Sequence, residues 1–198
     1  MPIIAGRASA AYGAGFAAVT TVPFTLAGNY DALGTVTVPS GGLSSITFAG
    51  IPQTGYSHLQ LRCLIKTTSN SNSDGNPYFR FNDDSGATYS GHDLRGAGSG
   101  TPTGFVGTSQ SYCGLGFSTG SNSNNTNTFA AYIIDILDYN NVAKFKTTRQ
   151  LEGYDLNGVE GSSFLRSNNW RSLNSINKIS FVNATFVENS SFVLYGVK

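Results

Sequence analysis

Short stretches of alternating apolar and polar residues recur along most of the chain, and this pattern constrains the fold more than any other feature. They begin at Gly34 and return about every ten to twelve residues, with Gly, Pro, Asn and Ser between them. Alternation with a period of two is typical of strands that have one buried face. The predicted strands lie at residues 34–38, 45–48, 58–66, 78–81, 87–90, 104–107, 111–117, 163–166, 176–182 and 191–197, besides one long hairpin.

The hairpin covers residues 129–151. Asn140 and Asn141 form a plausible two-residue turn, because Asn tolerates the positive φ of a type I′ turn. This turn would place Tyr139 opposite Val142, Ile136 opposite Phe145, Ile134 opposite Thr147 and Leu137 opposite Lys144. It would also pair Asp135 with Lys146 across a solvent-facing surface, while Ile134, Ile136 and Phe145 enter the core.

Composition favours a folded chain with few ions. Only 12% of the 198 residues are charged, about half the usual share, and the net charge is +1. The basic residues are scattered, so no electrostatic footprint for nucleic acid or a membrane surface is present. No run approaches the length of a membrane-spanning helix, and no secretory signal is evident. We therefore expect synthesis in a cytoplasm, with no nucleic-acid or membrane partner.

Residues 1–22 differ from the rest of the chain. They are rich in Ala and Gly, have one charge and show no periodicity, and we treat them as an N-terminal arm that precedes a sandwich domain at 23–198. A solvated leader would not usually carry so many large apolar residues. We expect an extended arm that becomes ordered on another subunit, with anchors at Pro2, Ile3, Ile4, Arg7, Tyr12, Phe16 and Phe24.

Metal and disulfide sites are poorly supported by the sequence. Cys63 and Cys113 lie in apolar strand-like runs, which favours two buried thiols, although neighbouring strands would allow a disulfide. His58 and His92 lack ligands at suitable spacing. Asp74, Asp83 and Asp84 form an oxygen-rich region without the spacing of a calcium loop, so solvated turns are favoured. We expect neither a metal nor a cofactor.

No catalytic constellation is apparent. Residues 116–120 match the G-x-S-x-G pattern of hydrolases, but the residues after Gly120 cannot form the required helix, and both histidines precede Ser118. Asp135 and Asp138 lie on opposite faces of one predicted strand and so do not suit glycoside hydrolysis. The sequence therefore predicts a protein that is not an enzyme. Trp170, Tyr154 and Tyr56 could instead stack on a sugar ring.

Three segments resemble a known group of proteins: ITFAGIPQTGYSHLQLR (46–62), ILDYNNVAKFKTTR (136–149) and SFVLYGVK (191–198). Together they resemble the small all-β virion proteins of tailed bacteriophages, especially phages of cyanobacteria. Such proteins occur as head decoration (cement) proteins and as tips of tail fibres. The resemblance covers roughly residues 35–198 and implies a jelly-roll-like sandwich, often trimeric, on the virion surface.

Two functions are compatible with these features. The first is a capsid decoration protein, which binds the outside of the major capsid protein and copies of itself through the N-terminal arm and stabilises subunit junctions. The second is a tail-fibre or receptor-binding tip that recognises a host glycan through the three aromatic residues. The sandwich is expected to have about ten antiparallel strands in either case.

Overall fold

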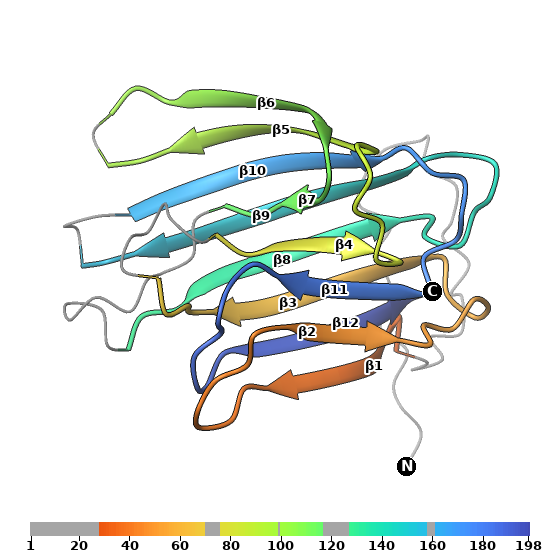
Figure 1. Cartoon of the computed structure of the whole chain (residues 1–198), viewed down its shortest axis with the longest axis horizontal. Coiled ribbons are helices and arrows are strands. Elements are labelled where there is room, and N and C mark those ends of the chain that lie inside the picture. The colour runs from red at the N-terminus through yellow and green to blue at the C-terminus, as the bar shows by residue number, and fades with distance from the viewer. Residues whose placement is uncertain (1–27, 70–75, 99, 117–126, 158–160) are drawn as a thin grey trace, which may run out of the picture.

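The computed structural model describes residues 28–69, 76–98, 100–116, 127–157 and 161–198, and within these ranges it contains strands and no helix (Figure 1). The strands are β1 (Tyr30–Thr37), β2 (Ile46–Ala49), β3 (His58–Ile65), β4 (Tyr78–Phe81), β5 (Tyr89–Gly96), β6 (Thr103–Gln110), β7 (Cys113–Gly114), β8 (Ala130–Leu137), β9 (Lys146–Asp155), β10 (Gly161–Trp170), β11 (Lys178–Val182) and β12 (Ser191–Val197). The all-β prediction is confirmed. The N-terminal arm and the boundary predicted after it lie outside the described residues.

The strands form two antiparallel sheets that face each other. The larger sheet has the order β1-β12-β3-β8-β9-β10-β5-β6, and the smaller has the order β2-β11-β4-β7. The strands β1-β12-β3-β8 and β2-β11-β4-β7 alone reproduce the two four-stranded sheets of a jelly roll. The predicted jelly-roll-like sandwich is therefore confirmed.

Two inserted hairpins enlarge this jelly roll. The β5–β6 hairpin lies between β4 and β7 in the chain, and the β9–β10 hairpin lies between β8 and β11. All four inserted strands join one edge of the larger sheet, next to β8, and we call them the extension. Figure 1 shows β5 and β6 lying beyond the last strand of the smaller sheet. The two sheets are thus unequal in width.

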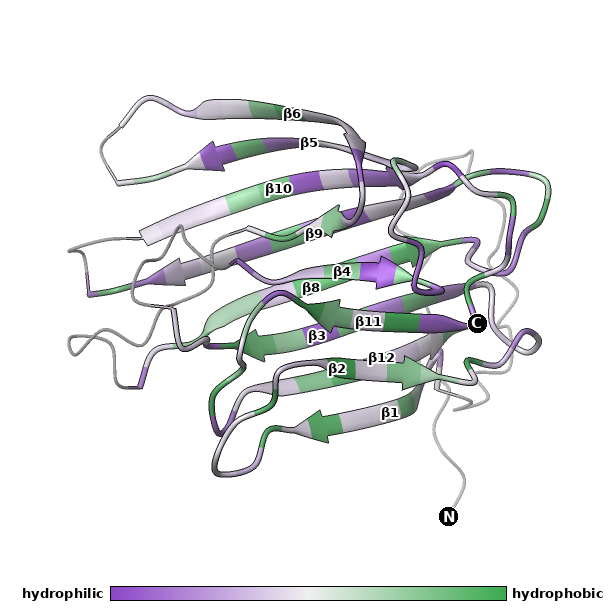
Figure 2. Ribbon diagram, in the orientation of Figure 1, coloured by the Kyte–Doolittle hydropathy of each residue, from purple (hydrophilic) through white to green (hydrophobic). Residues whose placement is uncertain are grey.

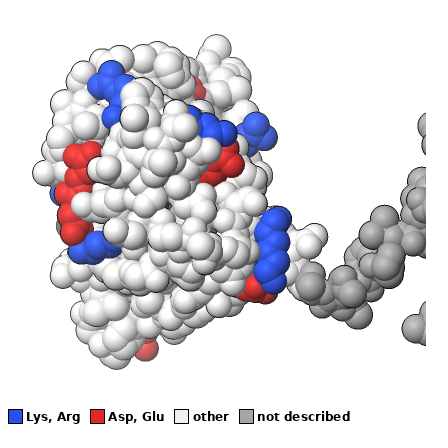
Figure 3. Space-filling model, turned by 90° about the vertical axis from the view of Figure 1, so that its right-hand side faces the viewer, with Lys and Arg blue, Asp and Glu red and all other residues white. Residues whose placement is uncertain are grey.

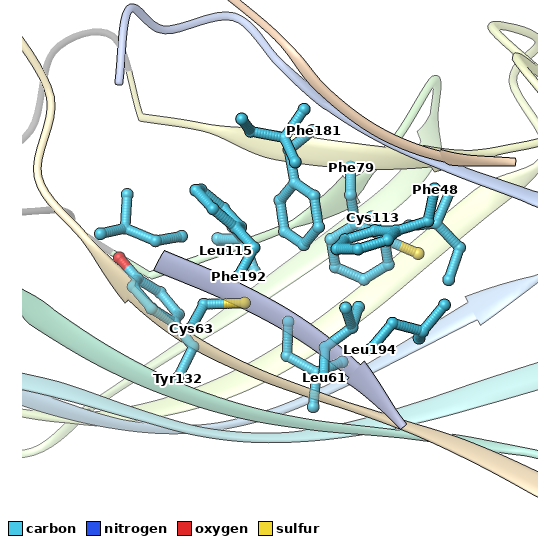
Figure 4. Packing of buried hydrophobic residues seen from close by; sticks show 14 of the residues in the cluster. Phe48, Leu61, Cys63, Phe79, Cys113, Leu115, Tyr132, Phe181, Phe192 and Leu194 are labelled. Atoms are coloured by element: carbon cyan, nitrogen blue, oxygen red, sulfur yellow. The ribbon is translucent and has the colours of Figure 1, made fainter. Parts of the chain in front are cut away.

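The core fills the space between the smaller sheet and the jelly-roll part of the larger one. Every second residue of β3 is buried there, and Phe181 of β11 packs against both Phe79 of β4 and Phe192 of β12 (Figure 4). Each fully buried side chain of this size contributes about 1.5–3 kcal/mol to folding. The strands of the jelly roll are held together mainly by this aromatic and aliphatic layer.

Both cysteines are free thiols in this core. Cys63 lies on β3 and Cys113 on β7, in different sheets, and both are buried. Burial raises the pKa of each thiol above its ordinary value. The prediction of two buried thiols is confirmed.

The register predicted for the long hairpin is wrong. Leu137 pairs with Thr147, Ile136 with Thr148 and Asp135 with Arg149, which displaces the pairing by three residues from the expected one. Because the displacement is odd, the residues of β9 exchange faces. The expected pair of Asp135 and Lys146 is absent: the Asp135 carboxylate accepts a hydrogen bond from Gln60 at 2.8 Å.

Residues of the turn explain the shift. The connection is longer than two residues, because Asp138 adopts a left-handed conformation (φ 50°) and its carbonyl accepts the Asn141 amide at 3.0 Å. Tyr139 is buried, and its hydroxyl donates to the carbonyl of Pro52. This anchor holds the turn against the body of the protein, so Lys146, not Phe145, enters the interior.

Substitutions at Ile136 and Phe145 distinguish the two registers. Ile136 is fully buried and Phe145 is 48% exposed. We expect Ile136→Ala to lower the free energy of unfolding by about 2–5 kcal/mol and Phe145→Ala to lower it by less than about 1 kcal/mol. Urea unfolding of both variants measures this difference, and equal losses would support the shorter turn.

Candidate functional site

The extension has a polar inner face, unlike the jelly roll. Beyond β7 the smaller sheet ends, and the inward side chains of β9, β10 and β5 include charged and amide groups. In Figure 2, β10 and β5 carry hydrophilic segments, whereas β2 and most of β11 are hydrophobic. The buried polar residues of these strands are Lys146, Thr148, Gln150, Glu152, Ser162 and Asn168.

A buried ion pair lies at the centre of this face. Arg166 of β10 and Asp93 of β5 are directly opposite each other, and their side chains meet at 2.7 Å while remaining only 12% and 6% exposed. Nη1 of Arg166 lies so close to Gly114 that a Cβ at that position would collide with it. A glycine on β7 is therefore needed for the guanidinium to reach its place.

Glu152 is the second carboxylate of this region. It is 4% exposed, and burial raises its pKa from 4.5 to about 7. The charge of Arg166 and a hydrogen bond from the Gly116 amide oppose this rise, while Asp93 adds to it. Glu152 therefore gains or loses its proton near neutral pH, inside the folded protein.

Amide and hydroxyl groups complete the network around Glu152. The Gln150 amide satisfies its neighbours when its nitrogen faces Glu152 and the Gly114 carbonyl, and in this orientation its oxygen accepts from the Thr148 hydroxyl at 3.1 Å. The Thr148 oxygen also accepts the Asn168 backbone amide at 3.3 Å. Such a connected network fixes side-chain positions, because each group left without a partner would cost free energy.

A pocket of about 320 Å³ opens where the extension meets the smaller sheet. Stacked rings of Tyr78 and Tyr112, with centroids 4.2 Å apart, contribute to one side, and Phe105 of β6, which is 56% exposed, contributes to another. Arg166 and Asn168 reach it from β10. The described residues that line it are Asn76, Pro77, Tyr78, Gly91, Phe105, Gly107, Gln110, Tyr112, Gly114, Leu115, Arg166, Asn168 and Asn183.

The outer face of the larger sheet carries a second distinctive feature. Ile133, Leu151, Leu165 and Leu94 lie directly opposite one another on β8, β9, β10 and β5. They are 43%, 60%, 53% and 54% exposed, respectively. We call these four residues the outer apolar row. Contiguous exposed apolar side chains of this kind mark interaction surfaces more often than single ones do.

The three aromatic residues predicted to stack on a sugar are not gathered in an exposed groove. Trp170 is 1% exposed, packs 5.4 Å from the Phe81 ring and donates its indole N–H to Asp84 at 2.7 Å. Tyr154 is also buried, at 7% exposure. Tyr56 is partly exposed and donates to Asp31. Stacking on a sugar needs an open ring face, so the burial of Trp170 and Tyr154 contradicts that role for both residues. The indole of Trp170 instead fills the core next to β4 and β5.

The acidic turn after β4 has a structural role. Asp84 accepts hydrogen bonds from the Gly86 amide and the Thr88 hydroxyl, both at 2.8 Å, besides the indole of Trp170. Asp83 pairs with Lys178 at 2.6 Å. Asp74 lies outside the described residues. In the described ranges no group of three or more His, Cys, Asp or Glu residues could hold a metal ion.

Of the remaining sequence candidates, the structure describes the two histidines. His58 accepts the Asp138 amide at its Nδ1 atom (2.9 Å), and His92 lies opposite Ser167 on the outer face. Ser118 and the arm residues Pro2, Ile3, Ile4, Arg7, Tyr12, Phe16 and Phe24 lie outside the described part of the chain. No helix in that part has the length and apolar character needed to cross a membrane.

Sequence reasoning missed Asp93, Glu152 and Arg166. Glu152 and Gln150 lie on the same face of β9 as Thr148, and all three are buried. A correct prediction of the hairpin register would have placed these side chains inside the protein. Arg166 was recognised only as the last residue of a short strand at 163–166, although β10 continues to Trp170. The available signal was a charged residue at an inward position of a long strand.

A scan against protein-family models, a search of curated proteins and a search of solved structures each found no match. The fold itself defines the class: a two-sheet jelly-roll sandwich with a four-stranded extension. The resemblance to phage virion proteins stays a prediction.

The pKa of Glu152 makes stability depend on pH. Its folded value of about 7 exceeds its unfolded value of 4.5, so its contribution is fully present below pH 4.5 and is lost as the pH rises through 7. The loss amounts to about 3 kcal/mol. We therefore expect the free energy of unfolding of Glu152→Gln, taken relative to that of the unmodified protein, to be about 2–3 kcal/mol higher at pH 8 than at pH 5. Urea unfolding at the two pH values measures this difference. A difference that does not change with pH would mean that Glu152 stays charged.

Proposed function

We propose that this protein is a non-enzymatic structural component of a bacteriophage virion that decorates the outer surface of the capsid. The observation that carries the proposal is the outer apolar row, a line of four half-exposed side chains across four adjacent strands. Jelly rolls are common in viral shells, but they also occur in lectins and cupins, so the fold supports this reading only by analogy.

The row is large enough to be one of several contacts that hold two copies together, but too small to be sufficient alone. Burying the exposed halves of four such side chains yields about 3–6 kcal/mol. Association costs at least about 4 kcal/mol in lost translational and rotational freedom. The row alone therefore supports weak association, which becomes firm when copies are held side by side on a repeating lattice.

A neighbouring copy of this chain is the partner that best fits the row. Asp135 and Arg149, which lie opposite each other on the outer face, place both signs of charge side by side. Figure 3, which views the molecule from the right-hand side of Figure 1, shows that acidic and basic side chains lie next to each other among mostly uncharged ones there as well. Each chain has a net charge of +1, so copies can come together without strong electrostatic repulsion. The homotrimer that we propose requires this.

The N-terminal arm supplies the second contact in this proposal. It precedes β1, which is the outermost strand at the jelly-roll end of the larger sheet. A segment attached there can leave the domain without crossing either sheet. Its widely spaced apolar residues, such as Ile3, Ile4 and Phe16, are suited to pockets on the major capsid protein, and its small residues permit close backbone approach.

The role of the row can be tested by its effect on binding to capsids, where copies lie side by side. We expect the double variant Leu151→Ser, Leu165→Ser to bind capsids less cooperatively than the unmodified protein in a titration, because both side chains leave the contact between neighbouring copies. Leu173→Ser is the matched control, since Leu173 is also half exposed but lies outside the larger sheet. Equal binding curves for all three proteins would contradict the proposed contact.

The alternative is a tail-fibre tip that binds a host glycan. The aromatic residues predicted for it give it little support, because Trp170 and Tyr154 are buried. Decoration is therefore the function that we favour.

A further inference from the structure

We propose that the pocket between β6 and the smaller sheet binds a neutral saccharide. This inference goes beyond the decoration function and does not depend on it, because the pocket and the outer apolar row lie on different faces of the larger sheet. At about 320 Å³ the pocket is at the small end of the range for ligand sites, about 300–1,000 Å³. One or two sugar rings are ligands of this size.

The polar groups of the lining favour hydroxyl groups over ions. Four of the lining side chains are amides: Asn76, Gln110, Asn168 and Asn183. Each amide both donates and accepts hydrogen bonds, as sugar hydroxyls do. Among the described residues of the lining, Arg166 is the single charged one, and it is already neutralised by Asp93 at 2.7 Å. An anionic ligand would therefore gain little from this site.

The amides are held in fixed orientations before any ligand arrives. The Asn168 side chain donates to the Gly114 carbonyl and that of Asn183 donates to the Asn76 carbonyl, both at 3.1 Å. Asn168 is only 4% exposed. Preorganised donors and acceptors reduce the entropy that binding costs.

Aromatic rings supply the apolar half of the site. The Tyr78 and Tyr112 rings are stacked with 17° between their planes, and the Arg80 guanidinium lies 5.1 Å from the Tyr78 centroid. Arg80 is itself fixed, because it donates to the Ser111 carbonyl at 3.0 Å. Tyr78 is thus covered on both faces and supports Tyr112, so the rings of Tyr112 and of Phe105 on β6 are the ones that offer electron-rich surfaces to the C–H groups of a pyranose.

Glycines create the hollow. A Cβ at Gly91 would collide with the Asn168 amide oxygen, and one at Gly107 would lie 3.2 Å from both Gln110 and Phe105. Larger residues at these positions would displace the groups that line the pocket. Glu152 and Asp93 are not among the lining residues, so the proposed role is binding without cleavage.

The test uses the full-length protein and defined sugars. Saturation-transfer NMR with the methyl glycosides of glucose, galactose, mannose and N-acetylglucosamine, followed by an array of neutral and charged oligosaccharides, should identify at least one neutral ligand. Phe105→Ala and Gln110→Ala should each weaken its affinity at least about tenfold. Phe105 is exposed, so its removal leaves the fold intact, which circular dichroism verifies.

Phe145→Ala serves as the control, because Phe145 is similarly exposed but is not part of the pocket. It should leave the affinity unchanged. The proposal is overturned if no neutral saccharide binds at millimolar concentration, if only charged saccharides bind, or if both pocket variants retain full affinity. None of these results bears on binding to capsids, so the decoration proposal is tested separately.

Discussion

The buried guanidinium of Arg166 is the constraint on which the extension depends. A charge in this position must be neutralised, and Asp93 does so from the neighbouring strand at 2.7 Å. Removing one member of such a pair costs about 3–5 kcal/mol. A one-residue slip of β10 against β5 would turn Arg166 or Asp93 to the outer face, so the ion pair also fixes the register of the extension.

Glu152 is a second buried carboxylate that interacts with the charge of Arg166. It shares the electrostatic field of Arg166 with Asp93, but burial dominates and raises its pKa to about 7. The jelly roll is stabilised by apolar packing, whereas the extension combines such packing at Phe164 with a polar network. A polar interior at the edge of the smaller sheet is what leaves room for a pocket with fixed amides.

Local sequence patterns were sufficient for the fold class but not for the site. Alternation located strands such as β3 and β12, because each buries every second residue. The register of β8 and β9 depends on the burial of Tyr139 against Pro52, a contact between residues far apart in the chain. The face on which Glu152 lies follows from that register and could not be predicted without it.

The aromatic residues illustrate the same limit. Composition identifies Trp170 as an unusual residue, but only the packing of β4, β5 and β10 decides that its ring lies in the core. Tyr78 and Tyr112 had no distinguishing feature in the sequence, yet the pairing of β4 with β7 brings them into a stack. Candidate binding residues were thus misplaced wherever tertiary contacts outweighed local pattern.

The two faces of the larger sheet have different proposed roles: the outer face contacts a neighbouring copy and the inner face of the extension holds a small ligand. Cryo-electron microscopy of virions that contain this chain tests the central claim most directly. We expect copies on the outside of the capsid, with residues 1–22 against the major capsid protein and Ile133, Leu151, Leu165 and Leu94 covered by a neighbouring copy. Copies confined to the tail, with these four side chains in solvent, would contradict it.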